Sequence, residues 1–147
     1  MIALTLTQPW ASLVSIGAKK VETRSWRTGY RGPLAIHAAK GWTADDRALL
    51  WEPDFRRALE PTGLVDYRVP HLHLPLGAIV ATAHLVSCVR TEDDTVEATE
   101  LAFGNYSPGR WAWSLIRVHA LPEPIPCKGA LGLWAVPAEI AARVGGT

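Results

Sequence analysis

The chain has 147 residues, a length typical of one domain, and we expect a single domain over residues 1–147. Its composition, 48% hydrophobic and 20% charged, is ordinary for a globular protein that buries its own core. The formal net charge of +1 excludes a chain that is polycationic over its whole surface.

The N-terminal residues predict a strand followed by a helix. Apolar residues alternate with threonine or alanine over residues 2–6, which is the pattern of a short strand. Pro9 suits the first position of a helix, and Trp10 and Leu13 then share one face, which we expect to pack inward. Gly17 suits the residue that ends such a helix in a left-handed conformation.

Two more strands follow, separated by a loop with several basic side chains. Residues 20–26 alternate so that Glu22, Arg24 and Trp26 share one face of the first strand. Residues 33–39 form the second. We predict that the two strands pair as a β-hairpin whose tip carries Trp26, Arg27, Tyr30 and Arg31.

The remainder of the chain predicts short helices and further strands. Thr43 can cap a helix, and Pro53 should break it. The clearest strand covers residues 77–90 and is apolar on both faces, as in a central strand or one bent around a barrel. The other segments are an irregular crossing at 60–76, an acidic and partly helical segment at 91–104, a strand at 110–120, a polyproline-type linker through Pro122, Pro124 and Pro126, a closing strand at 130–136 and a helix at 137–144.

Long strands, few short helices and no regular alternation of the two predict the α+β class. A small, mostly antiparallel β-barrel leaves few exposed strand edges. We therefore expect such a barrel, flanked by two to four short helices.

The cysteines, the N-terminus and the histidines bear on location and cofactors. Cys88 and Cys127 form no Cys-x-x-Cys motif, which fits a reducing, cytoplasmic environment. The first residues show neither a basic region nor a long apolar run, so we expect no signal peptide and no membrane span. His71 and His73 could point the same way, but no third ligand is near, and we expect no metal and no cofactor.

Basic and aromatic side chains concentrate in residues 17–31. Residues 1–44 hold six basic side chains and one acid, Glu22, whereas residues 91–100 hold five acids and no base. Basic groups neutralise phosphates, and aromatic rings between them offer faces on which bases stack. The pattern has two readings, a nucleic-acid cleft and a solvated edge hairpin whose Trp26 belongs to the core, and composition alone slightly favours the hairpin.

The same stretch resembles a known family. Gly17, Lys19, Glu22 and Arg24 match the G-x-K-x-x-E-x-R signature of the ASCH domain, the activating signal cointegrator homology domain. The resemblance implies a PUA-like β-barrel, related to folds that bind RNA or modified bases. The matching flanks are Gln8-Pro9-Trp10-Ala11 before the signature, and Arg31-Gly32-Pro33-Leu34, Ile36-His37-Ala38 and the segment 129–134 after it.

With this resemblance we expect a module that binds single-stranded nucleic acid or nucleotides in a basic cleft beside the first helix. RNA is the preferred partner, with single-stranded DNA or a modified nucleoside as the others. Gln8 would read a base edge, and Trp26 or Tyr30 would stack on a base. The residues expected in the interface are Gln8, Trp10, Lys19, Arg24, Trp26, Arg27, Tyr30, Arg31 and Lys40.

An enzyme that uses the same cleft is the alternative. ASCH relatives that hydrolyse the acetyl group of N4-acetylcytidine use the signature lysine, a threonine at the position of Glu22 and a glutamate on a later strand. Here Lys19 matches the lysine, but the strand at 77–90 holds no carboxylate. Lys19, Glu22 and His37 would carry the proton transfers of an amidohydrolase or a metal-independent ribonuclease.

Two readings compete with that enzyme. In the first, Glu22 forms a structural ion pair with Lys19 or Arg24, and His37 is a hydrogen-bonded histidine of the core. In the second, the chain is an interaction module whose cleft binds an acidic peptide.

Overall fold

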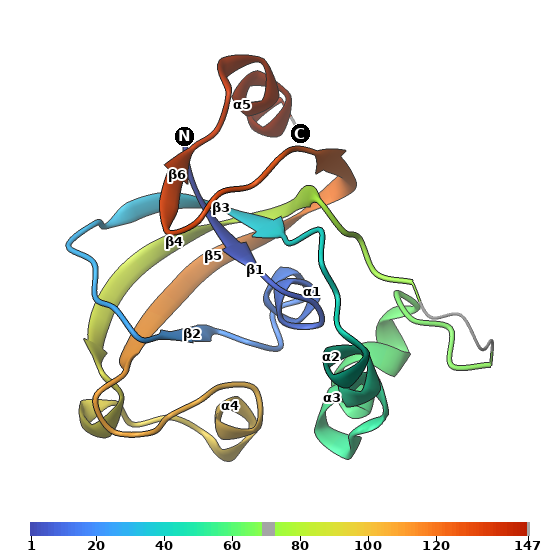
Figure 1. The fold of residues 1–147 in the computed structure, drawn as a ribbon, viewed down its shortest axis with the longest axis vertical. Helices are drawn as coiled ribbons and strands as arrows, with labels where there is room; N and C mark the ends of the chain where they lie inside the picture. Colours follow the sequence, from blue (N-terminus) through green and yellow to red (C-terminus); the bar gives the residue numbers. More distant parts are fainter. Residues whose placement is uncertain (69–72, 147) are drawn as a thin grey trace.

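A six-stranded sheet forms the body of the computed structural model, which describes residues 1–68 and 73–146. The strands lie in the order β2-β5-β4-β3-β1-β6, and only the β1–β3 pair is parallel. The sheet curls into half a barrel (Figure 1), which confirms the α+β class and the mostly antiparallel barrel. The strands are β1 (Ile2–Leu6), β2 (Val21–Arg24), β3 (Gly32–Ala38), β4 (Ala78–Arg90), β5 (Trp111–Pro126) and β6 (Leu133–Ala135).

The predicted hairpin of the two early strands is wrong. β2 pairs with β5, where Glu22 lies opposite Trp113, and β3 pairs instead with β1 and β4. The loop between them runs from the edge of the sheet to its middle, because Trp26 packs edge-on against Trp113 of β5. Aromatic packing near the start of the loop thus prevents the tight turn that a hairpin needs.

The polyproline-type linker is also wrong, because β5 continues through Pro122, Pro124 and Pro126. Ile125 is buried in this part of the strand and lies opposite Ile79 of β4. Alternate residues of a strand direct their N–H groups to the same side, so the three prolines remove donors from one side only. β2 pairs only with the first residues of β5, so that side carries no strand pairing here among the described residues.

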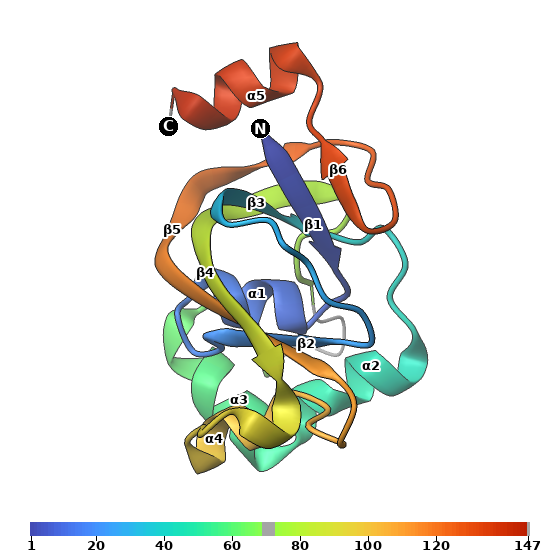
Figure 2. The ribbon, with the colours of Figure 1, turned by 90° about the vertical axis from the view of Figure 1, so that its left-hand side faces the viewer.

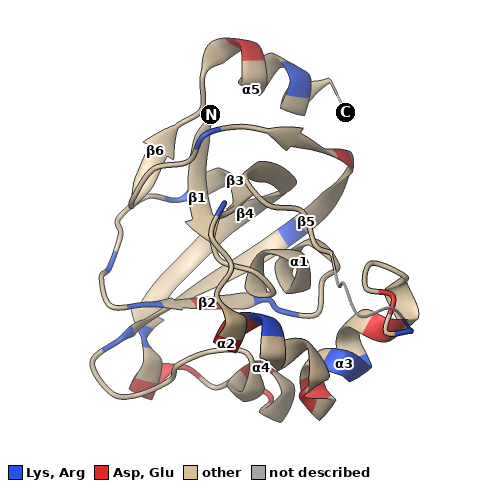
Figure 3. Cartoon of the chain, turned by 45° about the vertical axis from the view of Figure 1, so that its right-hand side comes forward, with Lys and Arg blue, Asp and Glu red and all other residues tan. Residues whose placement is uncertain are grey.

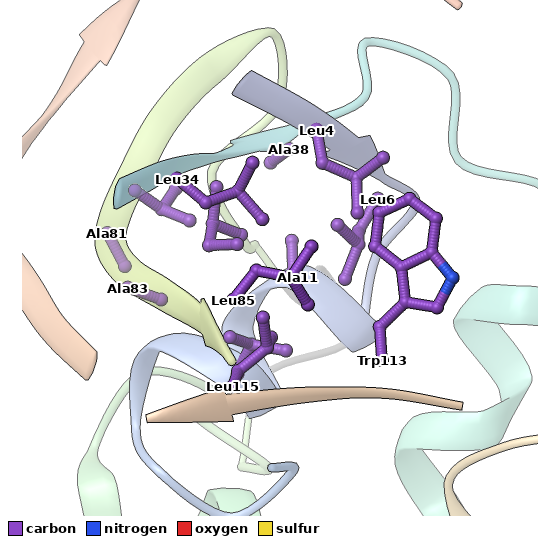
Figure 4. Close-up of a cluster of buried hydrophobic side chains, with 13 residues drawn as sticks. Leu4, Leu6, Ala11, Leu34, Ala38, Ala81, Ala83, Leu85, Trp113 and Leu115 are labelled. Atoms are coloured by element: carbon purple, nitrogen blue, oxygen red, sulfur yellow. The ribbon is translucent and has the colours of Figure 1, made fainter. Parts of the chain in front are cut away.

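Helix α1 (Trp10–Ser15) fills the concave side of the sheet. Ala11 and Val14 are fully buried and belong to the cluster drawn in Figure 4, which joins the helix to β1, β3, β4 and β5. Pro9 precedes the helix as its cap residue and is not its first helical residue. Gly17 follows with a φ of 80°, the left-handed conformation that its position predicts.

Three of the other helices gather at one end of the molecule and the fourth lies at the opposite end (Figures 1 and 2). Thr43 caps α2 as predicted, since Asp46 N donates to Thr43 Oγ1 at 3.1 Å. Pro53 begins α3, and Phe55 of α3 joins a second buried cluster with Phe103. These helices are α2 (Ala44–Ala48), α3 (Pro53–Leu59), α4 (Ala98–Ala102) and α5 (Ala138–Gly145).

With α1, the described residues therefore form five short α-helices, whereas the sequence predicted two to four. In the parts of the chain that the structure describes, no helix combines the length and the apolar character needed to cross a membrane.

Candidate functional site

A cavity of about 570 Å³ lies beside β2, at the C-terminal end of β1. We call it the β2 cavity. Its walls come from β1, the start of α1, β2, α3 and the segment that follows α4. The residues that line it are Thr5, Leu6, Thr7, Trp10, Glu22, Thr23, Arg24, Ser25, Trp26, Leu49, Phe55, Ala102, Phe103, Gly104, Asn105 and Arg110.

Aromatic rings form much of the wall of the β2 cavity. Trp10 packs edge-on against Phe55, with 6.4 Å between ring centroids, and Phe55 packs in the same way against Phe103 at 5.1 Å. Trp26 stands edge-on to the buried Trp113 at 4.7 Å. Because Trp10 and Trp26 are only partly buried, both keep ring surface on which a planar ligand could stack.

Glu22 is the carboxylate of the β2 cavity. The alternation of β2 brings Glu22 and Arg24 to the same wall, where Glu22 Oε2 lies 3.1 Å from Arg24 Nη2. The same nitrogen of Arg24 donates to the backbone carbonyl of Thr5 at 2.7 Å. On its other side, Glu22 Oε1 lies 3.5 Å from Lys19 Nζ. Two cations therefore fix the position of this carboxylate.

Lys19 is fully buried and is not among the residues that line the β2 cavity. Its ammonium donates to the carbonyl oxygens of Val21, at 2.6 Å, and Phe103, at 2.9 Å, besides its pairing with Glu22. Burial lowers the pKa of Lys19, and the carboxylates of Glu22 and Glu100 oppose that shift. The ammonium has an acceptor for each of its three N–H bonds, so Lys19 joins β2 to the segment after α4.

Arg110 contributes a second guanidinium to the β2 cavity. Its Nε donates to the carbonyl of Asn105 at 3.1 Å, and its Nη2 donates to the carbonyl of Thr23 at 3.3 Å. The sequence pattern singled out neither Arg110 nor the neighbouring rings of Phe55 and Phe103. No local signal shows that the segment after α4 folds back onto β2, so only the fold reveals these residues.

Gln8, expected to read a base edge, lies outside the β2 cavity and is fully buried. Its Nε2 donates to Ser12 Oγ at 2.9 Å and to the carbonyl of Pro75 at 2.8 Å. Its Oε1 accepts from the backbone N–H of Ser12 at 3.0 Å. The side chain thus anchors the start of α1 to a distant loop and presents no free donor to a ligand.

Three interface candidates lie in the loop between β2 and β3, outside the wall of the β2 cavity. The Arg27 guanidinium lies 5.6 Å from the ring centroid of Trp111. Tyr30 donates its hydroxyl to the carbonyl of Pro33, and Arg31 donates to the carbonyls of Thr28 and Tyr30. Arg27 and Arg31 are exposed, so their charges face solvent in the loop that follows β2.

His37 and Lys40 line a different cavity of about 850 Å³, which we call the β6 cavity. His37 is buried, its Nε2 donates to the carbonyl of Cys127 at 2.6 Å, and its Nδ1 lies 3.1 Å from Thr5 Oγ1. Burial lowers the pKa of His37, and the bond to Cys127 opposes that shift. The fold therefore keeps His37 apart from Glu22. The residues that line the β6 cavity are Thr5, His37, Ala39, Lys40, Gly77, Cys127, Lys128, Gly129, Ala130 and Leu131.

Among residues 1–68 and 73–146, no group of three or more His, Cys, Asp or Glu side chains is arranged to hold a metal ion. His71, one half of the pair considered from the sequence, lies outside the described residues.

Two known proteins are similar to the chain in sequence. The human and mouse proteins named activating signal cointegrator 1 are 25% and 26% identical to the chain over 137 residues. That match covers 93% of this chain but only 22% of each relative, so the chain spans about a fifth of their length.

Solved structures of an ASCH protein from Zymomonas mobilis share the fold. One superposes with a TM-score of 0.56 at 11% identity and covers 99% of this chain and 93% of that one. A mutant form of the same protein gives a TM-score of 0.55 at 12% identity and covers 99% and 96%. The ASCH domain model matches residues 4–124, and the chain belongs to the ASCH domain family.

Proposed function

We propose that the chain binds single-stranded nucleic acid or nucleotides, RNA preferred, with one base in the β2 cavity. The observation that carries the proposal is the wall of that cavity, where the partly exposed rings of Trp10 and Trp26 accompany the charged pair of Glu22 and Arg24. The volume of about 570 Å³ falls in the range of small-molecule sites.

Each part of the wall has a role in this proposal. Trp10 and Trp26 stack on the faces of a base, which gives affinity with little dependence on sequence. The carboxylate of Glu22 accepts from an amino or imino N–H at a base edge. Arg24 and Arg110 balance that carboxylate, so the cavity admits a ligand that carries phosphate.

The surroundings of the cavity support nucleic acid over an acidic peptide. Arg27 and Arg31 are exposed in the loop that leaves β2, where they can contact phosphates. Members of the ASCH family are thought to bind RNA. Aromatic rings beside a hydrogen-bonding carboxylate suit a base, whereas an acidic side chain offers neither a ring face to stack nor an N–H to donate.

The test compares two tryptophan variants in binding to a fluorescent RNA hexamer. Trp26→Ala removes a ring of the β2 cavity and should weaken binding about tenfold or more, since stacking contributes about 1–3 kcal/mol per base. Trp51→Ala removes a ring that is 50% exposed and lies outside the cavity, and should bind as the wild type does. Equal affinity for all three proteins, with unchanged thermal unfolding, would refute the proposed site.

The amidohydrolase or ribonuclease remains a second candidate because Glu22 places a carboxylate in the cavity wall. In that case Glu22 would be the proton acceptor, and the buried Lys19 would hold it in position. Mass spectrometry of an RNA oligonucleotide with one N4-acetylcytidine separates the two functions. Loss of the acetyl group, or chain cleavage, that disappears in Glu22→Gln would establish the enzyme; an unchanged oligonucleotide supports binding alone.

A further inference from the structure

We propose that a strand bound in the β2 cavity continues into the β6 cavity, where Lys40 and Lys128 hold its phosphates. This inference rests on the proposed function and adds two things to it. The ligand is an oligonucleotide of several nucleotides in place of a single nucleotide, and its path along the protein is defined.

The two cavities share a wall at Thr5, which lines both of them. On one side the carbonyl of Thr5 accepts from Arg24 Nη2 at 2.7 Å. On the other side Thr5 Oγ1 accepts from Trp134 Nε1 at 3.0 Å and lies 3.1 Å from His37 Nδ1. A strand that leaves the β2 cavity at the end of β1 therefore reaches the β6 cavity after passing a single residue.

The β6 cavity is built from fixed backbone. Cys127 N donates to the carbonyl of Gly77 at 3.0 Å, and Gly77 N donates to the carbonyl of Ala39 at 3.3 Å. Gly129 lies so close to His37 that a Cβ atom there would be 2.6 Å from His37 Cε1. A side chain at position 129 would clash, so glycine allows the segment after β5 to pack directly on the histidine.

Lys40 and Lys128 are the charged side chains of this cavity. Both are exposed, and neither forms an ion pair with a carboxylate of the described residues. Most of the acidic segments lie on or beside α2, α3 and α4 in Figure 3, and the strands β1 and β6 carry none. Two cations without an ion-pair partner are an attractive site for a phosphodiester.

Leu131 supplies an apolar surface at the same cavity and is 98% exposed. An apolar side chain with so little contact to its own protein is available to pack against a base or a ribose. The cavity volume of about 850 Å³ exceeds the 570 Å³ of the β2 cavity and falls in the range of small-molecule sites, which is enough for a nucleotide.

The experiment measures binding of a mononucleotide and of an RNA hexamer to the double variant Lys40→Gln/Lys128→Gln. Quenching of tryptophan fluorescence reports the mononucleotide, and anisotropy of a labelled hexamer reports the strand. The matched control, Lys20→Gln/Arg143→Gln, removes two exposed charges that line neither cavity. Thermal unfolding of each variant checks that it is folded.

We expect the cavity variant to bind the hexamer about 25-fold more weakly at 0.1 M salt, because each phosphate contact on a single strand contributes about 0.7 decade. The slope of log affinity against log salt should become shallower by about 1.4. Mononucleotide binding should equal that of the wild type, and the control should bind both ligands as the wild type does.

Three results would overturn the inference. If the cavity variant binds the hexamer like the wild type, or no worse than the control, the path is wrong while the proposed function stands. If hexaglutamate displaces the hexamer as well as unlabelled RNA does, the occupant is an acidic peptide. If the wild type binds neither ligand, the proposed function itself fails.

Discussion

At the scale of single residues, Lys19 acts within the protein and not on its surface. The ammonium holds Glu22 against the cavity wall and satisfies the carbonyls of Val21 and Phe103. A buried charge of this kind is tolerated only with such partners, and it leaves no donor for phosphate. The signature lysine therefore positions Glu22 in this chain.

Replacement of Lys19 tests that role. Lys19→Met fills similar space but leaves Glu22 and two carbonyls without their cation, so the free energy of unfolding should fall by about 3 kcal/mol. Lys20→Met, at an exposed neighbour, should change it little. Urea unfolding measures both variants. A Lys19→Met protein as stable as the wild type would contradict the structural role.

His37 makes the stability of the protein depend on pH. Its pKa in the folded protein lies below the ordinary value of 6.5, so below pH 6.5 the unfolded chain binds a proton that the folded protein resists. The free energy of unfolding should fall as the pH drops from 6.5, by up to about 1.4 kcal/mol per pH unit, and level off below the folded pKa.

The variant His37→Gln isolates this contribution. Its amide can still donate to Cys127 and accept from Thr5 but does not titrate. Urea unfolding between pH 5 and 7.5 should show a shallower slope for the variant than for the wild type, with little difference between them above about pH 7. Parallel curves for the two proteins would mean that His37 titrates in the folded state as it does in the unfolded chain.

At the scale of elements, β2 depends on a contact from α4. The carboxylate of Glu100 accepts from the backbone N–H groups of Lys20, at 2.8 Å, and Val21, at 3.2 Å. β2 is an edge strand, and this side chain satisfies donors at its free side. The strand that presents Glu22 and Arg24 is thus held by β5 on one side and by Glu100 on the other.

We expect Glu100→Ala to destabilise the protein by about 2 kcal/mol, because two backbone donors lose their acceptor in a buried setting. RNA affinity should fall as well, since β2 carries part of the β2 cavity. Glu97→Ala, at an exposed acid whose side chain makes no capping bond, provides the control. Urea unfolding and hexamer binding of both variants measure these effects. If Glu100→Ala is destabilised but binds the hexamer like the wild type, β2 does not take part in binding.

The sequence predicted the local elements better than their partners. The cap at Thr43, the helix break at Pro53 and the strand over 77–90 depend on neighbours along the chain, and the structure has all three. The pairing of β2 with β5 joins residues far apart in the chain, with the contact of Trp26 and Trp113 beside it, and no periodicity reports such a partner. Of the residues expected at the site, Trp10, Glu22, Arg24 and Trp26 line the β2 cavity, and its other wall comes from Phe103 and Arg110, far along the chain, which the sequence could not place.

At the scale of the whole molecule, the basic side chains of residues 1–44 divide between two places. Arg24 and Trp26 line the β2 cavity, whereas Lys40 lines the β6 cavity with Lys128 from the far end of the sequence. The excess of bases over acids in residues 1–44 therefore does not form one patch. A ligand that contacts all of these cations must be long enough to span both cavities.

The hydrogen bonds around Thr5 also have a fixed polarity. The indole of Trp134 can only donate to Thr5 Oγ1, and the carbonyl of Cys127 can only accept from His37 Nε2. The hydroxyl proton of Thr5 must then point to His37 Nδ1. The indole of Trp134 cannot become an acceptor, and the carbonyl of Cys127 cannot become a donor. This series of hydrogen bonds therefore cannot relay a proton. His37 therefore passes no proton along these bonds, and proton transfer at Glu22 would have to use water.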